Sequence, residues 1–258
     1  MIQNRQAARR IRDDLAQIQC LDCEGGRKLP LLAAIRSRFH LLLLGLCLPL
    51  GALFAGGAAA AAFPSAAPPN PTFRTILVVG DSLSAEYGLA RGTGWVSLLS
   101  DRVSQQEPQY SVVNASISGD TTSGGRSRLP RLLQKYRPEV VVLELGANDG
   151  LRGLDLAQMR DNLQAMIDAS RVAHARVLLI GMRIPPNYGR DYSEGFFDCY
   201  AQLARANRIP RVTFLLDGFA DRLDWFQADH MHPAERAQPS MLDNVWPKLR
   251  PLLGASAS

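Results

Sequence analysis

Residues 75–84 of the chain read TILVVGDSLS, an unbroken apolar run that ends in a glycine, an aspartate and a serine. A short apolar run that glycine stops is typical of a strand buried on both faces of a parallel sheet. Residues 139–145 (EVVVLEL) and 176–180 (RVLLI) have the same form. We therefore expect three buried strands, the first of them at Thr75–Val79.

Segments with helical spacing alternate with these strands. In residues 156–172, apolar side chains recur at three- and four-residue intervals, as they do on one face of a helix. Further helices are expected at 95–103, 129–136, 196–206 and 239–253, and short strands at 111–114 and 212–216. Strands that alternate with helices predict an α/β domain, in which a central parallel sheet is covered on both faces.

Polar residues follow three of the expected strands. Asp81 and Ser82 come after the first, Gly119 lies in a short loop after the second, and Asn148 and Asp149 come after the third. Ligands of such sheets bind outside the carboxyl ends of the strands. We therefore expect these side chains to meet at one edge.

The residue types at that edge suit nucleophilic catalysis. A serine hydroxyl is a weak nucleophile and needs a base, usually a histidine that a carboxylate orients. Residues 229–233 (DHMHP) supply both groups in one loop. A glycine N–H and an asparagine amide are suitable donors to an oxyanion. The Gly-x-Ser-x-Gly signature of many lipases is absent from the sequence.

Four blocks occur in order: GDSLS at 80–84, NASISGD at 114–120, GAND at 146–149 and the DHMHP ending. With them, the chain from about Arg74 to Leu253 resembles the GDSL or SGNH hydrolases. The stretches VVNASISGDT, ELGANDGLRG and PPNYGRDY are similar to the subgroup of periplasmic multifunctional thioesterases, arylesterases and lysophospholipases.

This resemblance implies a flavodoxin-like, three-layer α/β/α sandwich, the SGNH hydrolase fold. It implies that Ser82 is the nucleophile, His232 its base and Asp229 the partner of that base. It also implies an oxyanion hole made by the backbone N–H groups of Ser82 and Gly119 and the side-chain amide of Asn148. Neither a cofactor nor a metal is implied.

Two histidines compete for the role of base. His232 lies three residues after Asp229, as in the family motif, and the following proline holds the chain extended there. His230 stands where the subgroup has a glycine. A His-x-His pair also suggests a metal, but no third ligand is evident in the sequence. We therefore expect His232 to be the base.

The loop at 183–192 follows the fourth strand, so it is expected at the active edge. Loops in such places line or gate substrate channels. Its substrate-lining candidates are Arg183, Pro185, Asn187 and Tyr188. A rigid connector, held by its two prolines, is the alternative.

Residues 1–63 form an N-terminal leader. Their apolar stretch at 41–57 follows two arginines and precedes a run of alanines, as in a secretory signal peptide. Export to the periplasm or secretion is therefore expected, with an uncleaved membrane anchor as the alternative. Residues 64–73 are Pro-rich and predict an extended tether, and 74–258 is the hydrolase domain.

Most of the net charge of +5 belongs to the leader, because the rest of the chain carries 21 basic and 20 acidic residues. This balance argues against a nucleic-acid partner. The expected substrate is a small acyl ester, a thioester or a lysolipid, and a transient contact with a membrane surface remains open. Three rivals remain: a carbohydrate acetylesterase, which would need a wide polar cleft, a non-catalytic envelope binding module, and a peptidase, although nothing in the sequence marks a peptide groove.

Overall fold

The computed structural model describes residues 73–254. The expected signal peptide and nearly all of the expected tether lie outside these residues. The elements are β1 (Arg74–Gly80), α2 (Trp95–Gln106), β2 (Tyr110–Asn114), α3 (Thr122–Tyr136), β3 (Val140–Glu144), α4 (Ala147–Leu151), α5 (Leu156–Val172), β4 (Arg176–Ile180), α6 (Arg190–Asn207), β5 (Arg211–Val212) and α7 (Gln238–Gly254). Three single-turn 3₁₀ helices, η1 (Pro186–Tyr188), η2 (Leu223–Trp225) and η3 (Glu235–Ala237), lie in the connections.

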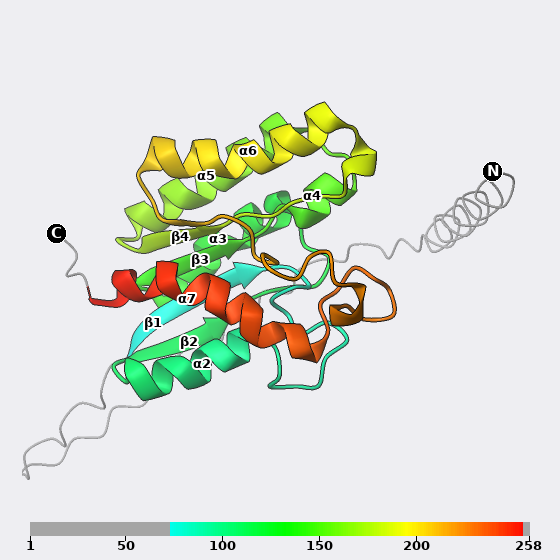
Figure 1. Cartoon of the computed structure of the whole chain (residues 1–258). Helices are drawn as coiled ribbons and strands as arrows, with labels where there is room; N and C mark the ends of the chain where they lie inside the picture. The colour runs from blue at the N-terminus through cyan, green and yellow to red at the C-terminus, as the bar shows by residue number, and fades with distance from the viewer. Residues whose placement is uncertain (1–72, 255–258) are drawn as a thin grey trace, which may run out of the picture. The chain divides into compact units, whose positions relative to one another are not determined.

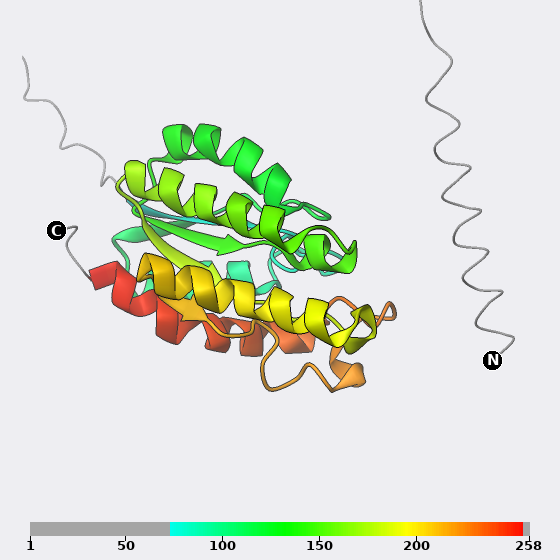
Figure 2. The same cartoon turned by 90° about the horizontal axis from the view of Figure 1, so that it is seen from above.

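The five strands form one parallel sheet in the order β2-β1-β3-β4-β5. This is the flavodoxin-like order. Helices α2 and α7 pack together against one face, and α3 and α5 pack together against the other (Figure 1). Helix α6 lies beside α5, and Figure 2 shows the sheet between α5 and α7. The predicted three-layer fold is confirmed.

The central strands β1 and β3 form the core because helices cover both faces of the sheet and bury their side chains. All five residues of β3 are buried, and so are the last five of β1. Such strands have no solvent face, so their apolar sequence runs continuously instead of alternating. The carboxyl ends of β1, β2 and β3 are neighbours in the sheet, so the loops after them open on one side.

The structure corrects the expected start of helix α3. The sequence predicts a glycine-rich turn before a helix at residue 129, but the helix begins at Thr122 and contains Gly124 and Gly125. A Cβ on Gly125 would come within 2.2 Å of Leu145 Cδ1. Close packing of α3 against the end of β3 therefore selects glycine inside this helix and overrides its low helix propensity.

Three other boundaries differ from the expectation. Asn148 lies in the short helix α4 rather than in a loop, and Arg190 already begins α6, so the loop after β4 ends at Gly189. The strand expected at 212–216 is only the two-residue β5. Among residues 73–254, no helix is both long enough and apolar enough to cross a membrane.

Candidate active site

Ser82 lies in the turn that follows β1. Its neighbour Asp81 caps this turn: the side-chain Oδ1 accepts the N–H of Leu83 at 3.0 Å, and the backbone carbonyl accepts the N–H of Ala85 at 3.0 Å. Asp81 is fully buried, whereas Ser82 is partly exposed. The turn therefore fixes Ser82 at the carboxyl edge of the sheet with its hydroxyl accessible.

The hydroxyl of Ser82 is in contact with the C-terminal loop. Its Oγ lies 2.9 Å from His232 Nε2, and His232 Nδ1 lies 2.6 Å from Asp229 Oδ2. These two distances connect a serine, a histidine and a carboxylate in one hydrogen-bonded chain. The structure brings together the three side chains that the sequence singles out, although Ser82 and His232 are 150 residues apart.

Asp229 also organises the loop that carries His232. Its Oδ1 accepts the backbone N–H groups of Met231 at 2.9 Å and of His232 at 3.0 Å. Burial opposes ionisation of this carboxyl, but the hydrogen bonds from His232 and Met231 outweigh it and lower the pKa of Asp229 to about 2. Asp229 is therefore a carboxylate at neutral pH and favours the His232 tautomer with its proton on Nδ1.

The other histidine does not join this chain. His230 is exposed, lies in the left-handed region at φ 54°, and lines the neighbouring cavity. Left-handed backbone favours glycine, which gives a physical reason for the glycine that the resemblance expects at this position. The ring of Tyr87, which the sequence analysis did not single out, lies 4.4 Å from the ring of His232, centroid to centroid.

Two backbone donors face the same edge without a partner. Within the described part of the chain, neither the N–H of Ser82 nor that of Gly119 has a hydrogen-bond acceptor. Gly119 has a φ of +78°, a backbone conformation that residues with a Cβ rarely adopt. Arg152 donates to the carbonyl of Gly119 at 2.9 Å and so helps to hold this turn.

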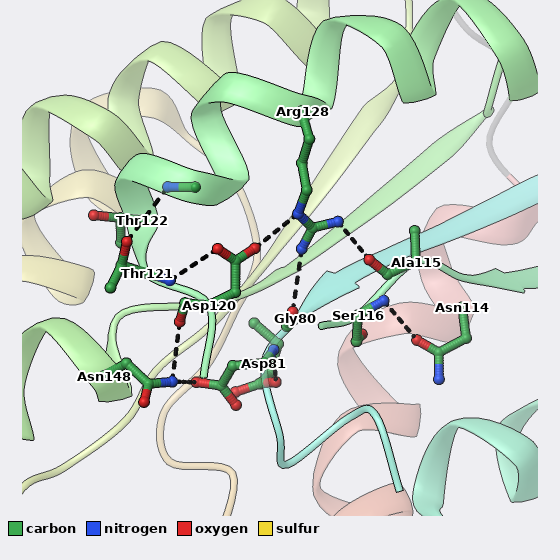
Figure 3. Close-up of polar contacts among 12 residues, drawn as sticks. Gly80, Asp81, Asn114, Ala115, Ser116, Asp120, Thr121, Thr122, Arg128 and Asn148 are labelled. Carbon is green, nitrogen blue, oxygen red and sulfur yellow. Dashed lines mark hydrogen bonds and ion pairs between the residues drawn. The ribbon is translucent and has the colours of Figure 1, made fainter. Parts of the chain in front are cut away.

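Asn148 lines the same cavity as Ser82 and Gly119, and its amide is already engaged (Figure 3). Its Nδ2 donates to the backbone carbonyl of Asp120 at 2.9 Å and to Asp81 Oδ2 at 3.1 Å. An amide nitrogen carries two hydrogens, so both are occupied in this arrangement. Donation to a substrate therefore requires one hydrogen to turn away from its present acceptor or to be shared with it.

Two buried carboxyl groups lie beneath Ser82. Glu144, at the end of β3, accepts a hydrogen bond from Ser84 Oγ at 2.6 Å and one from the N–H of Asp81 at 3.3 Å. Burial and then the charge of Asp81 raise the pKa of Glu144 well above its usual range. Burial also raises the pKa of Asp81 to about 6, although the Leu83 N–H and the Asn148 amide oppose the rise. Burial and the neighbouring carboxylate therefore both favour the neutral form of Glu144.

The neighbouring Asp149 has a different task. It is 3% exposed, and its two oxygens accept the N–H and the hydroxyl of Thr122 at 2.9 and 2.5 Å. A carboxylate at the first turn of a helix satisfies donors that the helix leaves unpaired. Asp149 thus caps α3 from a neighbouring segment, while the adjacent Asn148 faces the edge.

Beside Ser82 lies a cavity of about 660 Å³. Its apolar wall includes side chains from the segments after β3, β4 and β5, among them Leu151, Met182, Ile184, Phe214, Leu216 and Phe226. Of the expected substrate-lining residues, Arg183 and Pro185 line the cavity, whereas Asn187 and Tyr188 do not. The phenol of Tyr188 instead donates to the carbonyl of Leu151 at 2.8 Å.

A parallel sheet whose carboxyl edge carries a hydrogen-bonded serine, histidine and aspartate beside an apolar cavity defines a class, the serine-dependent hydrolases. No cluster of three or more His, Cys, Asp or Glu side chains able to hold a metal ion occurs within residues 73–254. The GDSL-like Lipase/Acylhydrolase family matches residues 78–238, more than half of the chain. The chain belongs to this family and is a carboxylic ester hydrolase.

The chain is similar to several characterised proteins. "Esterase TesA" of Pseudomonas aeruginosa is 50% identical over 180 residues, which cover 70% of this chain and 90% of that protein. "Thioesterase 1/protease 1/lysophospholipase L1" of Escherichia coli K12 is 41% identical over 179 residues, covering 69% and 85%. The esterase EstA of Pseudoalteromonas, solved in a form inhibited by monoethylphosphonate, is 40% identical with a TM-score of 0.67, covering 70% of this chain and all of that one.

Proposed function

We propose that Ser82 attacks the acyl carbon of an ester or thioester while His232 takes the proton from its hydroxyl. Asp229 stabilises the imidazolium that forms, and His232 then gives the proton to the leaving group. The acyl group stays on Ser82 until water, activated by His232, releases the carboxylic acid. The observation that carries this proposal is the chain of two short contacts, 2.9 Å and 2.6 Å, that connects the three side chains.

The proposed oxyanion hole consists of the two unpaired backbone N–H groups, at Ser82 and Gly119, and the amide of Asn148. The contact of Asn148 with Asp81 is longer than its contact with the Asp120 carbonyl, 3.1 against 2.9 Å. We therefore assign the hydrogen that now faces Asp81 to the substrate. The hydrogen on the Asp120 carbonyl keeps the amide in place during the reaction.

The cavity supports an acyl chain as the part of the substrate that is buried. Its wall is largely apolar, so each methylene that leaves water contributes about 0.8 kcal/mol to binding. A carbohydrate acetylesterase would need a wide polar cleft instead. The names of the relatives, esterase, arylesterase, thioesterase and lysophospholipase, support phenols, thiols and glycerophospho alcohols as the proposed leaving groups. Arg183 and Pro185 are proposed to line the path of these groups.

Chain length is the first test of this substrate class. With p-nitrophenol as the constant leaving group, kcat/KM is expected to rise by up to about fourfold per added methylene until the chain fills the cavity. Thioesters and lysophospholipids of the preferred length are then compared with the phenyl ester. A preference for acetyl groups, above all on carbohydrates, would contradict the acyl-chain proposal.

Export is proposed for the full chain from the signal-like stretch at 41–57. If this segment is cleaved, protein isolated from the cell envelope should begin close to Phe63, and N-terminal sequencing measures this directly. A full-length protein in the membrane fraction would instead indicate the uncleaved anchor. A full-length protein in the cytoplasm would contradict export.

A further inference from the structure

Arg128 connects three segments that surround the candidate active site (Figure 3). It extends from helix α3, and its Nε donates to Asp120 Oδ2 at 2.7 Å. Its Nη2 donates to the carbonyl of Gly80 at 3.2 Å, and its Nη1 donates to the carbonyl of Ala115. One guanidinium thus holds the end of β1, the segment after β2 and the turn that contains Gly119.

Two of these acceptors lie within two residues of a proposed oxyanion donor, and one of them also holds the third donor. Gly80 precedes Ser82 by two residues, and Asp120 directly follows Gly119. The backbone carbonyl of Asp120 accepts the Asn148 amide at 2.9 Å. The three donors come from three different segments, so their relative placement depends on what holds those segments together.

We infer that Arg128 is the positioning residue of the oxyanion hole. Its guanidinium keeps the ends of β1 and β2 and the Gly119–Asp120 turn at fixed separations, and through Asp120 it keeps the Asn148 amide aimed at the edge. Arg128 touches no reacting atom. The inference rests on the proposed oxyanion hole, to which it adds the group that holds the hole together.

Only arginine has the side-chain shape to hold these three segments together. A guanidinium presents N–H donors in a rigid planar fork, and here three of its nitrogens reach three different acceptors. A lysine has one nitrogen on a flexible chain and cannot reproduce that arrangement. The side chains of Arg128 and Asp120 are 19% and 13% exposed, so water competes little for these bonds.

The Arg128→Lys variant keeps the positive charge and removes the planar set of guanidinium N–H donors. Because oxyanion donors act in the transition state, their misplacement is expected to lower kcat and leave KM within a few fold. A displacement of about 1 Å at such a site costs up to about a hundredfold, so we expect kcat to fall by about ten- to a hundredfold. Arg131→Lys, the same substitution at an exposed position of the same helix, should leave kcat unchanged.

A double-mutant cycle with Asn148→Ala separates positioning from simple destabilisation. Loss of one oxyanion donor lowers kcat by about a hundred- to a thousandfold, which is the expected effect of Asn148→Ala alone. In that background Arg128→Lys should lower kcat by less than it does in the parent, because one of the three donors that it positions is already gone. Asp120→Asn, which keeps the backbone carbonyl and weakens the ion pair, should also lower kcat rather than raise KM.

Each outcome of this cycle decides one question. Thermal unfolding of every variant ensures that rates are measured on folded protein. The positioning role is wrong if Arg128→Lys lowers only the melting temperature or raises only KM. It is also wrong if the double variant lowers kcat by the full product of the two single effects. In each of these cases the oxyanion hole itself stands. If Asn148→Ala leaves kcat unchanged, the proposed hole itself fails.

Discussion

The Ser82→Ala variant is expected to lose ester hydrolysis almost completely, with kcat lower by about 10⁴- to 10⁶-fold. The methyl group leaves His232 without a nucleophile to deprotonate, and the remaining donors stabilise only an uncatalysed attack by water. The fold should persist, because the Oγ of Ser82 has His232 as its only hydrogen-bond partner within the described residues and its side chain is partly exposed. Partly exposed positions of this kind change the free energy of unfolding by about 0.5 kcal/mol or less.

A phosphonate ester provides the direct measurement. The parent should gain the mass of one phosphonyl group on the peptide that carries Ser82, and the Ser82→Ala variant should gain none. Ser118→Ala is the matched control, since Ser118 lines the same cavity but lies in another loop. Hydrolysis near the parent rate in Ser82→Ala, or labelling of Ser118 in place of Ser82, would show that the nucleophile is misassigned.

Replacing His232 with alanine is expected to lower kcat by a factor similar to that of Ser82→Ala, because a hydrogen-bonded serine, histidine and aspartate act as a unit. Without the imidazole, the Ser82 hydroxyl loses its proton acceptor at 2.9 Å, and the carboxylate of Asp229 has no base to orient. The measurement is kcat for a phenyl ester with a good leaving group, together with the melting temperature of each variant.

The control for this variant is a change at His230, the other histidine of the loop. His230→Ala should retain most of the activity, because no contact joins its ring to Ser82 or Asp229 among the described residues. His230→Gly is the sharper control, since glycine removes a left-handed strain of about 1 kcal/mol at φ 54°. Activity that depended on His230 and survived the loss of His232 would reverse the assignment of the base.

The central strands and the placement of the candidate residues could be predicted from the sequence because both follow from burial. Strands with no solvent face show continuous apolar runs, and the carboxyl ends of parallel strands meet at one edge. These two rules bring Ser82, Gly119 and Asn148 together without knowledge of the strand order. His232 needed the spacing in the family motif as well, because its loop follows no long strand.

The features that the sequence does not predict depend on contacts between segments that are distant in the chain. Gly125 has the appearance of a turn residue, and only the lack of room beside Leu145 shows that it belongs inside a helix. Arg128 is one of many arginines in the chain, and no local pattern distinguishes it from exposed Arg131. Glu144 lies in an apolar strand, where a lone carboxyl is a usable signal of a buried polar network.

The 150-residue separation between Ser82 and His232 also governs when the protein becomes active. Ser82 follows the first strand, and its proposed base arrives only with the segment that leads into α7, the last helix of the described chain. A nascent chain, or one that is still unfolded, therefore contains the nucleophile but no hydrolytic machinery. Closing so long a loop is entropically costly until the sheet between its ends has formed. We therefore expect ester hydrolysis to appear only after the segment before α7 has docked at the edge of the sheet.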